Sequence, residues 1–175
     1  FPVSQYEIMD AFEQIHTKSP GDVYWQVDEF HCFDYLAPHL DESMSVFEFN
    51  SLTAQLSKLD EQQETALEGL LQMQVKNHMQ ENSGIITVPE LMMLAHNVDH
   101  CHVLADVHTD TELGKFCADN DFLPELTALP DSAYALLDYA KIGKQMRESE
   151  AGTFTPHGYV VRTEELEPLP EHEPQ

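Results

Sequence analysis

Basic residues are scarce in this sequence: eight Lys and Arg stand against 32 Asp and Glu in 175 residues, a formal net charge of −24. Binding to a phosphate backbone gains free energy when a patch of Lys and Arg displaces condensed counterions. Eight scattered Lys and Arg residues offer no such basic patch. The composition therefore disfavours nucleic-acid binding. Because self-repulsion at this charge opposes compaction, we expect the acids to serve a purpose, such as binding a basic partner or imitating another polyanion.

Other shortages exclude further classes of protein. Seven Gly leave little material for Gly-rich phosphate loops, and no GxSxG or HExxH motif occurs. Cys32, Cys101 and Cys117 have no metal-ligand spacing and fit a reducing cytoplasm better than a disulfide scaffold. No apolar run approaches the roughly 18 residues of a membrane span, and no signal peptide is recognisable, although the chain begins at Phe1 without a Met. We therefore expect a cytoplasmic protein that is no enzyme, carries no cofactor and binds no membrane.

The acidic residues are dispersed through a chain of globular composition. Apolar residues make up 42% of it, with nine Phe, six Tyr and one Trp, which is enough to bury a core. Three long stretches contain acids but no Lys or Arg: residues 19–57, 77–114 and 116–140. A disordered acidic tail concentrates its acids and lacks apolar residues, and only residues 164–175 fit that description.

Local patterns predict an α+β fold made of small modules. Capping boxes of the form Ser/Thr-x-x-Glu begin at Ser4, Ser45 and Thr87, and in each the two side chains satisfy free N–H groups of a helix start. The predicted elements are helices after Ser4, Ser45, Asp60, Thr87 and Thr109, short helices near 123–126 and 132–146, strands at 23–27 and 102–107, a loop at 35–43 and a hairpin at 152–163. The predicted modules are an N-terminal α/β module (1–43), a helical module (44–83), a C-terminal sheet-plus-helix module (84–163) and an acidic flexible tail (164–175).

Four histidines cluster in the third module, at His96, His100, His102 and His108. His96 and His100 are four residues apart, a spacing that can chelate zinc on one helix. However, the predicted helix ends near residues 97–99, and the general base of an HExxH motif is missing. Surface histidines are the simpler interpretation, so we assign no metal ligand and keep a metal-dependent enzyme only as the weaker alternative.

The dispersed carboxylates are the candidate functional residues. Carboxylates three or four residues apart on a helix lie about 5–6 Å from each other, which is similar to the phosphate spacing along a nucleic-acid strand. A solvated acidic face is the simpler interpretation of any single run, but it explains less when the excess covers the whole chain. The candidate acids are Asp28, Glu29, Asp34, Asp41, Glu42, Asp60, Glu61, Glu64, Glu68, Asp99, Asp106, Asp110, Glu112, Asp119, Asp121, Glu125, Asp131 and Asp138.

Several segments, in order, resemble the ArdA family of antirestriction proteins. They are Phe1-Pro2-Val3 before a helix, EFHCFDY at 29–35, SVFEFNSL at 45–52, DYAKIGK at 138–144 and GTF at 152–154. The resemblance spans residues 1 to about 163. The chain differs from the family in lacking a strand pair before Phe1, in a longer region between His96 and His108, and in the Gln and Met that follow Lys144.

The resemblance implies a DNA mimic carried by mobile genetic elements. Members of the family occupy the DNA-binding cleft of type I restriction–modification enzymes, and they form homodimers of elongated, three-module chains. On this hypothesis the acids replace phosphates, no bond is broken and no cofactor is needed. The alternatives are an acidic interaction module for another basic DNA-processing protein, the metal-dependent enzyme at residues 96–108, and halophilic adaptation as the cause of the charge.

Overall fold

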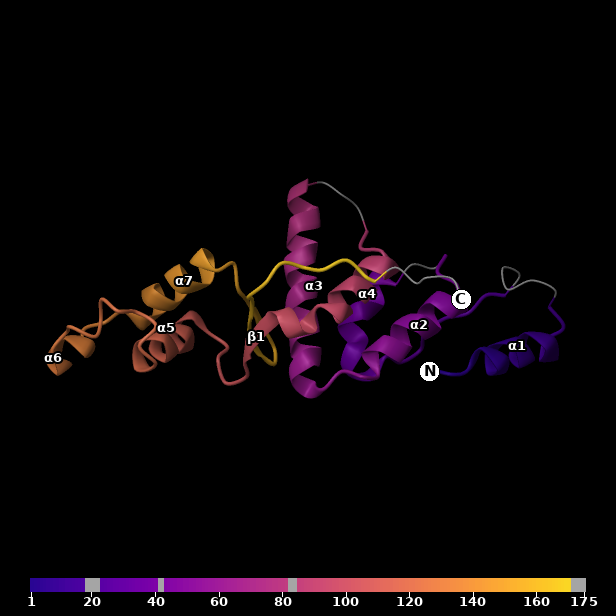
Figure 1. Cartoon of the computed structure of the whole chain (residues 1–175), viewed down its shortest axis with the longest axis horizontal. Helices are drawn as coiled ribbons and strands as arrows, with labels where there is room; N and C mark the ends of the chain where they lie inside the picture. The colour runs from indigo at the N-terminus through magenta and orange to yellow at the C-terminus, as the bar shows by residue number, and fades with distance from the viewer. Residues whose placement is uncertain (18–22, 41–42, 82–84, 171–175) are drawn as a thin grey trace. The chain divides into compact units, whose positions relative to one another are not determined.

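The computed structural model describes residues 1–17, 23–40, 43–81 and 85–170 (Figure 1). By its contacts the chain divides into two compact units. The first unit contains residues 1–60, 74–97 and 166–175, and the second contains residues 61–73 and 98–165. Each unit therefore joins segments that are distant in the sequence, and the long helix α3 (Glu61–Glu81) contributes to both.

Three helices of the first unit begin at the predicted capping boxes. They are α1 (Gln5–Gln14), α2 (Val46–Leu56) and α4 (Val88–His96). In each box the cap hydroxyl accepts a hydrogen bond from the backbone N–H three residues later, and the Glu there accepts one from the cap N–H. Pro89 at the start of α4 is tolerated because the N–H it lacks would have no partner in the first turn. These helix predictions are confirmed.

An aromatic cluster around Phe49 of α2 forms part of the core of the first unit. The ring centroid of Phe49 lies 5.2 Å from that of Phe1, 5.2 Å from that of Trp25 and 5.6 Å from that of Phe30. The rings are tilted or edge-on to one another, which are favourable arrangements for aromatic pairs. Leucines of α2 and α4, which pack against each other, complete this core and are almost fully buried.

Two predictions in the first unit are wrong. Residues 23–27 form no strand, although their side chains alternate between half-buried and exposed as the pattern predicted. Trp25 packs on the Phe49 ring, so the half-burial of its side chain does not require the backbone to join a sheet. The loop predicted for residues 35–43 is also wrong over its first part, since the 3₁₀ helix η2 (His31–His39) runs through Pro38.

The sheet belongs to the second unit. It contains β1 (Cys101–Leu104), β2 (Thr153–Thr155) and β3 (Gly158–Arg162), antiparallel and in the order β1-β3-β2. The hairpin predicted at residues 152–163 is confirmed as β2 and β3, with Gly158 at a φ of 144° that favours glycine. The strand predicted for residues 102–107 is confirmed only in part, because β1 ends at Leu104 and the chain turns there.

Helices cover both faces of this sheet. A Cβ placed on Gly69 of α3 would lie 2.5 Å from the Cβ of Val160, so α3 approaches β3 as closely as a glycine allows. Tyr159, the neighbour of Val160, points to the opposite face and packs in a buried cluster with Leu113 and Cys117 of α5 (Asp110–Asp119). Because successive side chains of β3 point to opposite faces of the sheet, α3 packs on the face of Val160 and α5 packs on the face of Tyr159.

The helices α5 and α7 (Tyr139–Ser149) pack closely against each other through glycines. A Cβ on Gly114 would lie 1.9 Å from the carbonyl oxygen of Tyr139, and one on Gly143 would lie 1.7 Å from the carbonyl oxygen of Asp110. Such distances are far below van der Waals contact, so only glycine permits this approach. No sequence pattern had indicated this crossing.

The chain between α5 and α7 differs from its prediction. Residues 123–126 form successive turns rather than a short helix, with the N–H of Leu126 donating to the carbonyl of Leu123 at 2.9 Å. The single helix predicted for residues 132–146 is instead two, α6 (Asp131–Tyr134) and α7, because Asp138 caps a new helix through a hydrogen bond from the N–H of Lys141. The one-turn 3₁₀ helix η3 (Val98–His100) leads into β1.

The α+β fold class is confirmed, with a small antiparallel sheet near the C-terminal end after the main helices. The division into modules at residues 43, 83 and 163 stays a prediction, as does the flexible character of residues 164–175. At the start of that stretch the backbone of Glu167 is held by the buried side-chain amide of Asn97, at 2.8 Å and 2.7 Å. Among the described residues no helix has the length and apolar character needed to cross a membrane.

Candidate functional site

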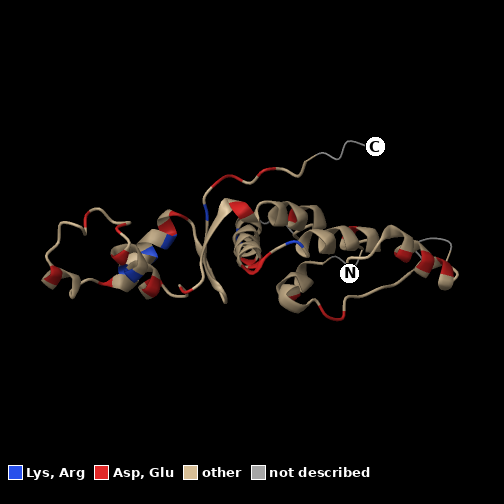
Figure 2. Ribbon diagram, turned by 60° about the horizontal axis from the view of Figure 1, so that its bottom comes forward, with Lys and Arg blue, Asp and Glu red and all other residues tan. Residues whose placement is uncertain are grey.

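Acidic residues, red in Figure 2, occur in both units, and most of those in the described ranges are exposed. Two of the candidate acids, Asp41 and Glu42, lie outside the described residues. Most of the others are exposed: Asp28, Glu29, Asp34, Asp60, Glu61, Asp99, Asp106, Glu112, Asp119, Asp121, Glu125, Asp131 and Asp138. The structure thus presents these acids to solvent over many elements rather than gathering them in one cleft.

Some exposed acids also have a local structural role that keeps them in place. Glu112 accepts a hydrogen bond from the backbone N–H of His108 at 2.7 Å, and this bond lowers the pKa of the Glu112 carboxyl. Asp34 accepts from the N–H of Phe30 at 3.0 Å. Such bonds fix the direction of a carboxylate at the start of a helix while leaving it open to solvent, so it stays available to a partner.

Asp110 is held by an internal partner instead. The guanidinium group of Arg147 in α7 donates two hydrogen bonds to the carboxylate of Asp110, from Nε to Oδ1 at 2.8 Å and from Nη2 to Oδ2 at 3.1 Å. This hydrogen-bonded pair lowers the pKa of Asp110 and raises the pKa of Arg147. The negative charge of Asp110 is therefore paired with Arg147 and joins α5 to α7.

The acids at the start of α3 do not form a fully exposed row. Glu61 is exposed, Glu64 is half-buried, and Glu68 is buried against the sheet. The carboxylate of Glu68 lies 3.1 Å from Nδ1 of His157 in the hairpin turn. Helical spacing alone could not distinguish the solvent face of this helix from the face that the hairpin covers.

The longest exposed acidic stretch of the second unit connects α5 with α7. Asp119, Asp121, Glu125, Asp131 and Asp138 are all exposed there, and no Lys or Arg interrupts residues 116–140. Basic residues flank this stretch in the sequence on α5 and α7, where Figure 2 shows the blue segments. The stretch therefore presents five exposed acids without an intervening Lys or Arg.

The histidine cluster gives no metal site among the residues that the structure describes. No group of three or more His, Cys, Asp or Glu side chains lies close enough there to hold an ion. His100 instead contacts the carbonyl of Glu165 through Nδ1 at 3.0 Å, while His96, His102 and His108 are exposed.

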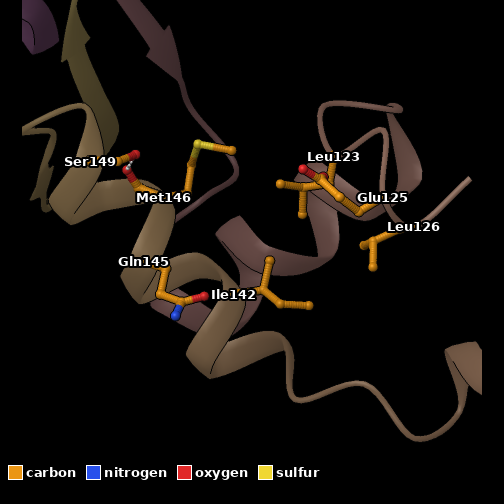
Figure 3. Close-up of a pocket in the computed structure, with 7 residues that line it drawn as sticks. All are labelled: Leu123, Glu125, Leu126, Ile142, Gln145, Met146 and Ser149. Atoms are coloured by element: carbon orange, nitrogen blue, oxygen red, sulfur yellow. Dashed lines mark hydrogen bonds between the residues drawn. The ribbon is translucent and has the colours of Figure 1, made fainter.

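A groove in the second unit was missed by sequence reasoning. It has a volume of about 370 Å³ and lies between α7 and the turns at residues 123–126 (Figure 3). Seven residues line it: Leu123, Glu125, Leu126, Ile142, Gln145, Met146 and Ser149. We call it the α7 groove. It could not be predicted because the turns that form one wall were expected to be helical.

A second recess lies on the sheet of the same unit. It has a volume of about 280 Å³ and is lined mainly by apolar side chains of the sheet, α5 and α7. At its polar edge the hydroxyl of Tyr159 donates to Glu150 at 2.5 Å, and burial together with this bond raises the pKa of Tyr159. Burial also raises the pKa of the Cys117 thiol, so at neutral pH neither group is the anion that nucleophilic chemistry requires.

No protein-family model matches the chain, and no curated protein matches it significantly.

Proposed function

We propose that this protein is an antirestriction protein of the ArdA type, a DNA mimic that occupies the DNA-binding cleft of a type I restriction–modification enzyme. The observation that carries the proposal is the solvent exposure of carboxylates over many elements of both units, in a chain of net charge −24. The ordered sequence resemblance supplies the identity of the partner. On this proposal the protein acts in the cytoplasm, as a homodimer encoded by a mobile element, and is not an enzyme.

The physical basis of the mimicry is electrostatic. A cleft that binds DNA is lined with Lys and Arg, so a negatively charged protein is steered into it at a rate that falls as salt increases. The exposed acids act as the phosphates do, and the acidic stretch between α5 and α7 supplies five of them with no Lys or Arg between them. Asp110 and Glu68 belong to the framework rather than to the imitating surface, because both have internal partners.

The decisive experiment is inhibition of a purified type I restriction enzyme on unmodified DNA, titrated with this protein at two salt concentrations. Competitive mimicry predicts inhibition that weakens at the higher salt and is relieved by excess DNA. Absence of inhibition at low salt would refute the proposal. Recovery of only unrelated basic proteins from a host lysate would then favour the alternative of an interaction module for a different DNA-processing protein.

A further inference from the structure

The α7 groove lies at the surface of the second unit, beside its apolar core. Ile142, Gln145, Met146 and Ser149 follow one another at helical spacing on one face of α7, and none of them is charged. Leu123 and Met146 also pack against the buried cluster around Tyr159, so the floor of the groove is continuous with the core. The groove thus offers apolar surface that is already fixed in place by buried neighbours.

The length of the α7 wall of the groove matches about two turns of a helix. From Ile142 to Ser149 its α7 wall covers seven residue steps, or about 10 Å at 1.5 Å per residue. That length is about two helical turns, over which a partner helix presents side chains at positions i, i+3, i+4 and i+7. Figure 3 shows Ile142 and Met146 on one side of the opening and Leu123 and Leu126 on the other.

The charges around the groove select the kind of partner. Glu125 lines it, and the chain that forms its second wall carries exposed Asp119, Asp121 and Asp131 with no Lys or Arg. On α7, a helix that turns by about 100° per residue, Lys144 and Arg147 point away from the groove face, whereas Lys141 lies at its edge one turn before Gln145. Glu125 and the three Asp residues outnumber this one base. A complementary occupant is therefore apolar at its centre and basic around it.

A second copy of this chain fits these charges poorly. Each copy carries a formal net charge of −24, and contact through this groove would bring the same acidic stretch from both chains together. Like charges that face each other across an interface cost free energy, so any homodimer is expected to use another surface.

We propose that the α7 groove binds the apolar face of a basic amphipathic helix of the partner protein. The proposal rests on the proposed function for the identity of that partner, which we take to be the restriction enzyme. The dispersed acids accelerate encounter, whereas an apolar side chain seated in the groove slows dissociation. DNA has no counterpart of this contact, so the groove gives the mimic an affinity that salt does not screen.

The first test uses the full-length protein and a synthetic helical peptide of Leu and Lys, with the leucines at i, i+3, i+4 and i+7. We expect Ile142→Gln and Leu126→Gln, which change opposite walls, each to weaken peptide binding about tenfold. Leu136→Gln is the matched control, because Leu136 is 86% exposed and lies outside the groove; its affinity should equal that of the wild type. Circular dichroism verifies that each variant keeps its helices.

Peptide controls separate charge from apolar contact. A peptide with Ala in place of Leu should bind weakly and equally to all variants, and one with Glu in place of Lys should not bind. Equal binding of the Leu and Ala peptides to wild type and variants would overturn the proposal. So would a dimer, measured by sedimentation, that Ile142→Gln dissociates, because a second copy would then be the occupant.

The restriction enzyme provides the second test. We expect the two groove variants to inhibit it about tenfold less well than wild type, mainly through faster dissociation, with an unchanged salt dependence. If wild type inhibits and the groove variants inhibit equally, the groove proposal is wrong and the mimicry stands. If wild type does not inhibit, the mimicry is wrong, and the peptide measurements alone decide whether the groove binds a basic helix.

Discussion

Arg147 is the basic side chain with the best-defined partner in the described part of the chain, since it makes two hydrogen bonds to Asp110. We predict that Arg147→Gln lowers the free energy of unfolding by about 1 kcal/mol at pH 7, because a paired charge and both bonds are lost. Urea unfolding measures this. Lys144→Gln is the control: Lys144 lies 3.9 Å from Glu148, both side chains are about 60% exposed, and its removal should change little. Equal losses in the two variants would contradict the prediction.

The same pair predicts a dependence on pH. Arg147 holds the pKa of Asp110 below its usual range, so the pair stabilises the folded state above the ordinary pKa of a carboxyl, about 4. That contribution disappears as the pH falls through the lowered pKa of Asp110. We therefore expect the stability difference between wild type and Arg147→Gln to be constant near neutral pH and to shrink below about pH 4. A difference that grew on acidification would have the wrong sign.

Individual residues show where sequence reasoning stops. The acidic surface was predictable, because charge is a property of the sequence itself, and most candidate acids are indeed exposed. Asp110 and Glu68 were placed in the same set, yet their partners lie 37 and 89 residues away along the chain. No local pattern marks such a pairing, since it depends on which helix faces the tertiary contacts cover.

At the scale of elements, the crossing of α5 and α7 depends on glycine. We predict that Gly114→Ala destabilises this crossing by about 2 kcal/mol, because the new Cβ would overlap the backbone of Tyr139. Hydrogen exchange of the α5 and α7 amides measures the local loss. Thr111→Ala, on an exposed position of the same helix, is the control and should be neutral or slightly stabilising, since Ala is the better helix former. Unchanged exchange in Gly114→Ala would contradict the close packing.

The elements that were predicted correctly are determined by residues close together in the sequence. A capping box satisfies its own helix start, and the β2–β3 hairpin joins its strands by a short turn, so neither requires distant residues. The elements that were predicted wrongly or missed depend on tertiary contacts between residues distant in the sequence. Trp25 in the predicted strand packs on the Phe49 ring without joining a sheet. Gly69 and Gly114 belong to no local pattern that identifies Val160 and Tyr139, the residues they approach.

For the whole molecule, the net charge predicts a stability that rises with moderate salt. At −24 the folded chain repels itself, and salt screens that repulsion. We expect the melting temperature to increase by several degrees between about 10 mM and 200 mM NaCl. It should change little at higher salt, because the screening length has already fallen to about 7 Å at about 200 mM. Differential scanning calorimetry measures it. Folding that required molar salt would instead support halophilic adaptation as the origin of the acids.

Mimicry by many dispersed charges also predicts that single acids matter little and that their effects add. Asp106, Asp119 and Asp131 are exposed, and each should contribute about 0.5 kcal/mol to inhibition of the restriction enzyme, as exposed charge pairs do. The triple Asp→Asn variant should then inhibit roughly tenfold less well and with a weaker salt dependence, whereas each single variant should lose only about twofold. The triple Asp→Glu variant keeps every charge and should inhibit as wild type does. Complete loss in any single Asp→Asn variant would mean that one contact dominates, and the imitation of a phosphate backbone would then be the wrong description of how this surface works.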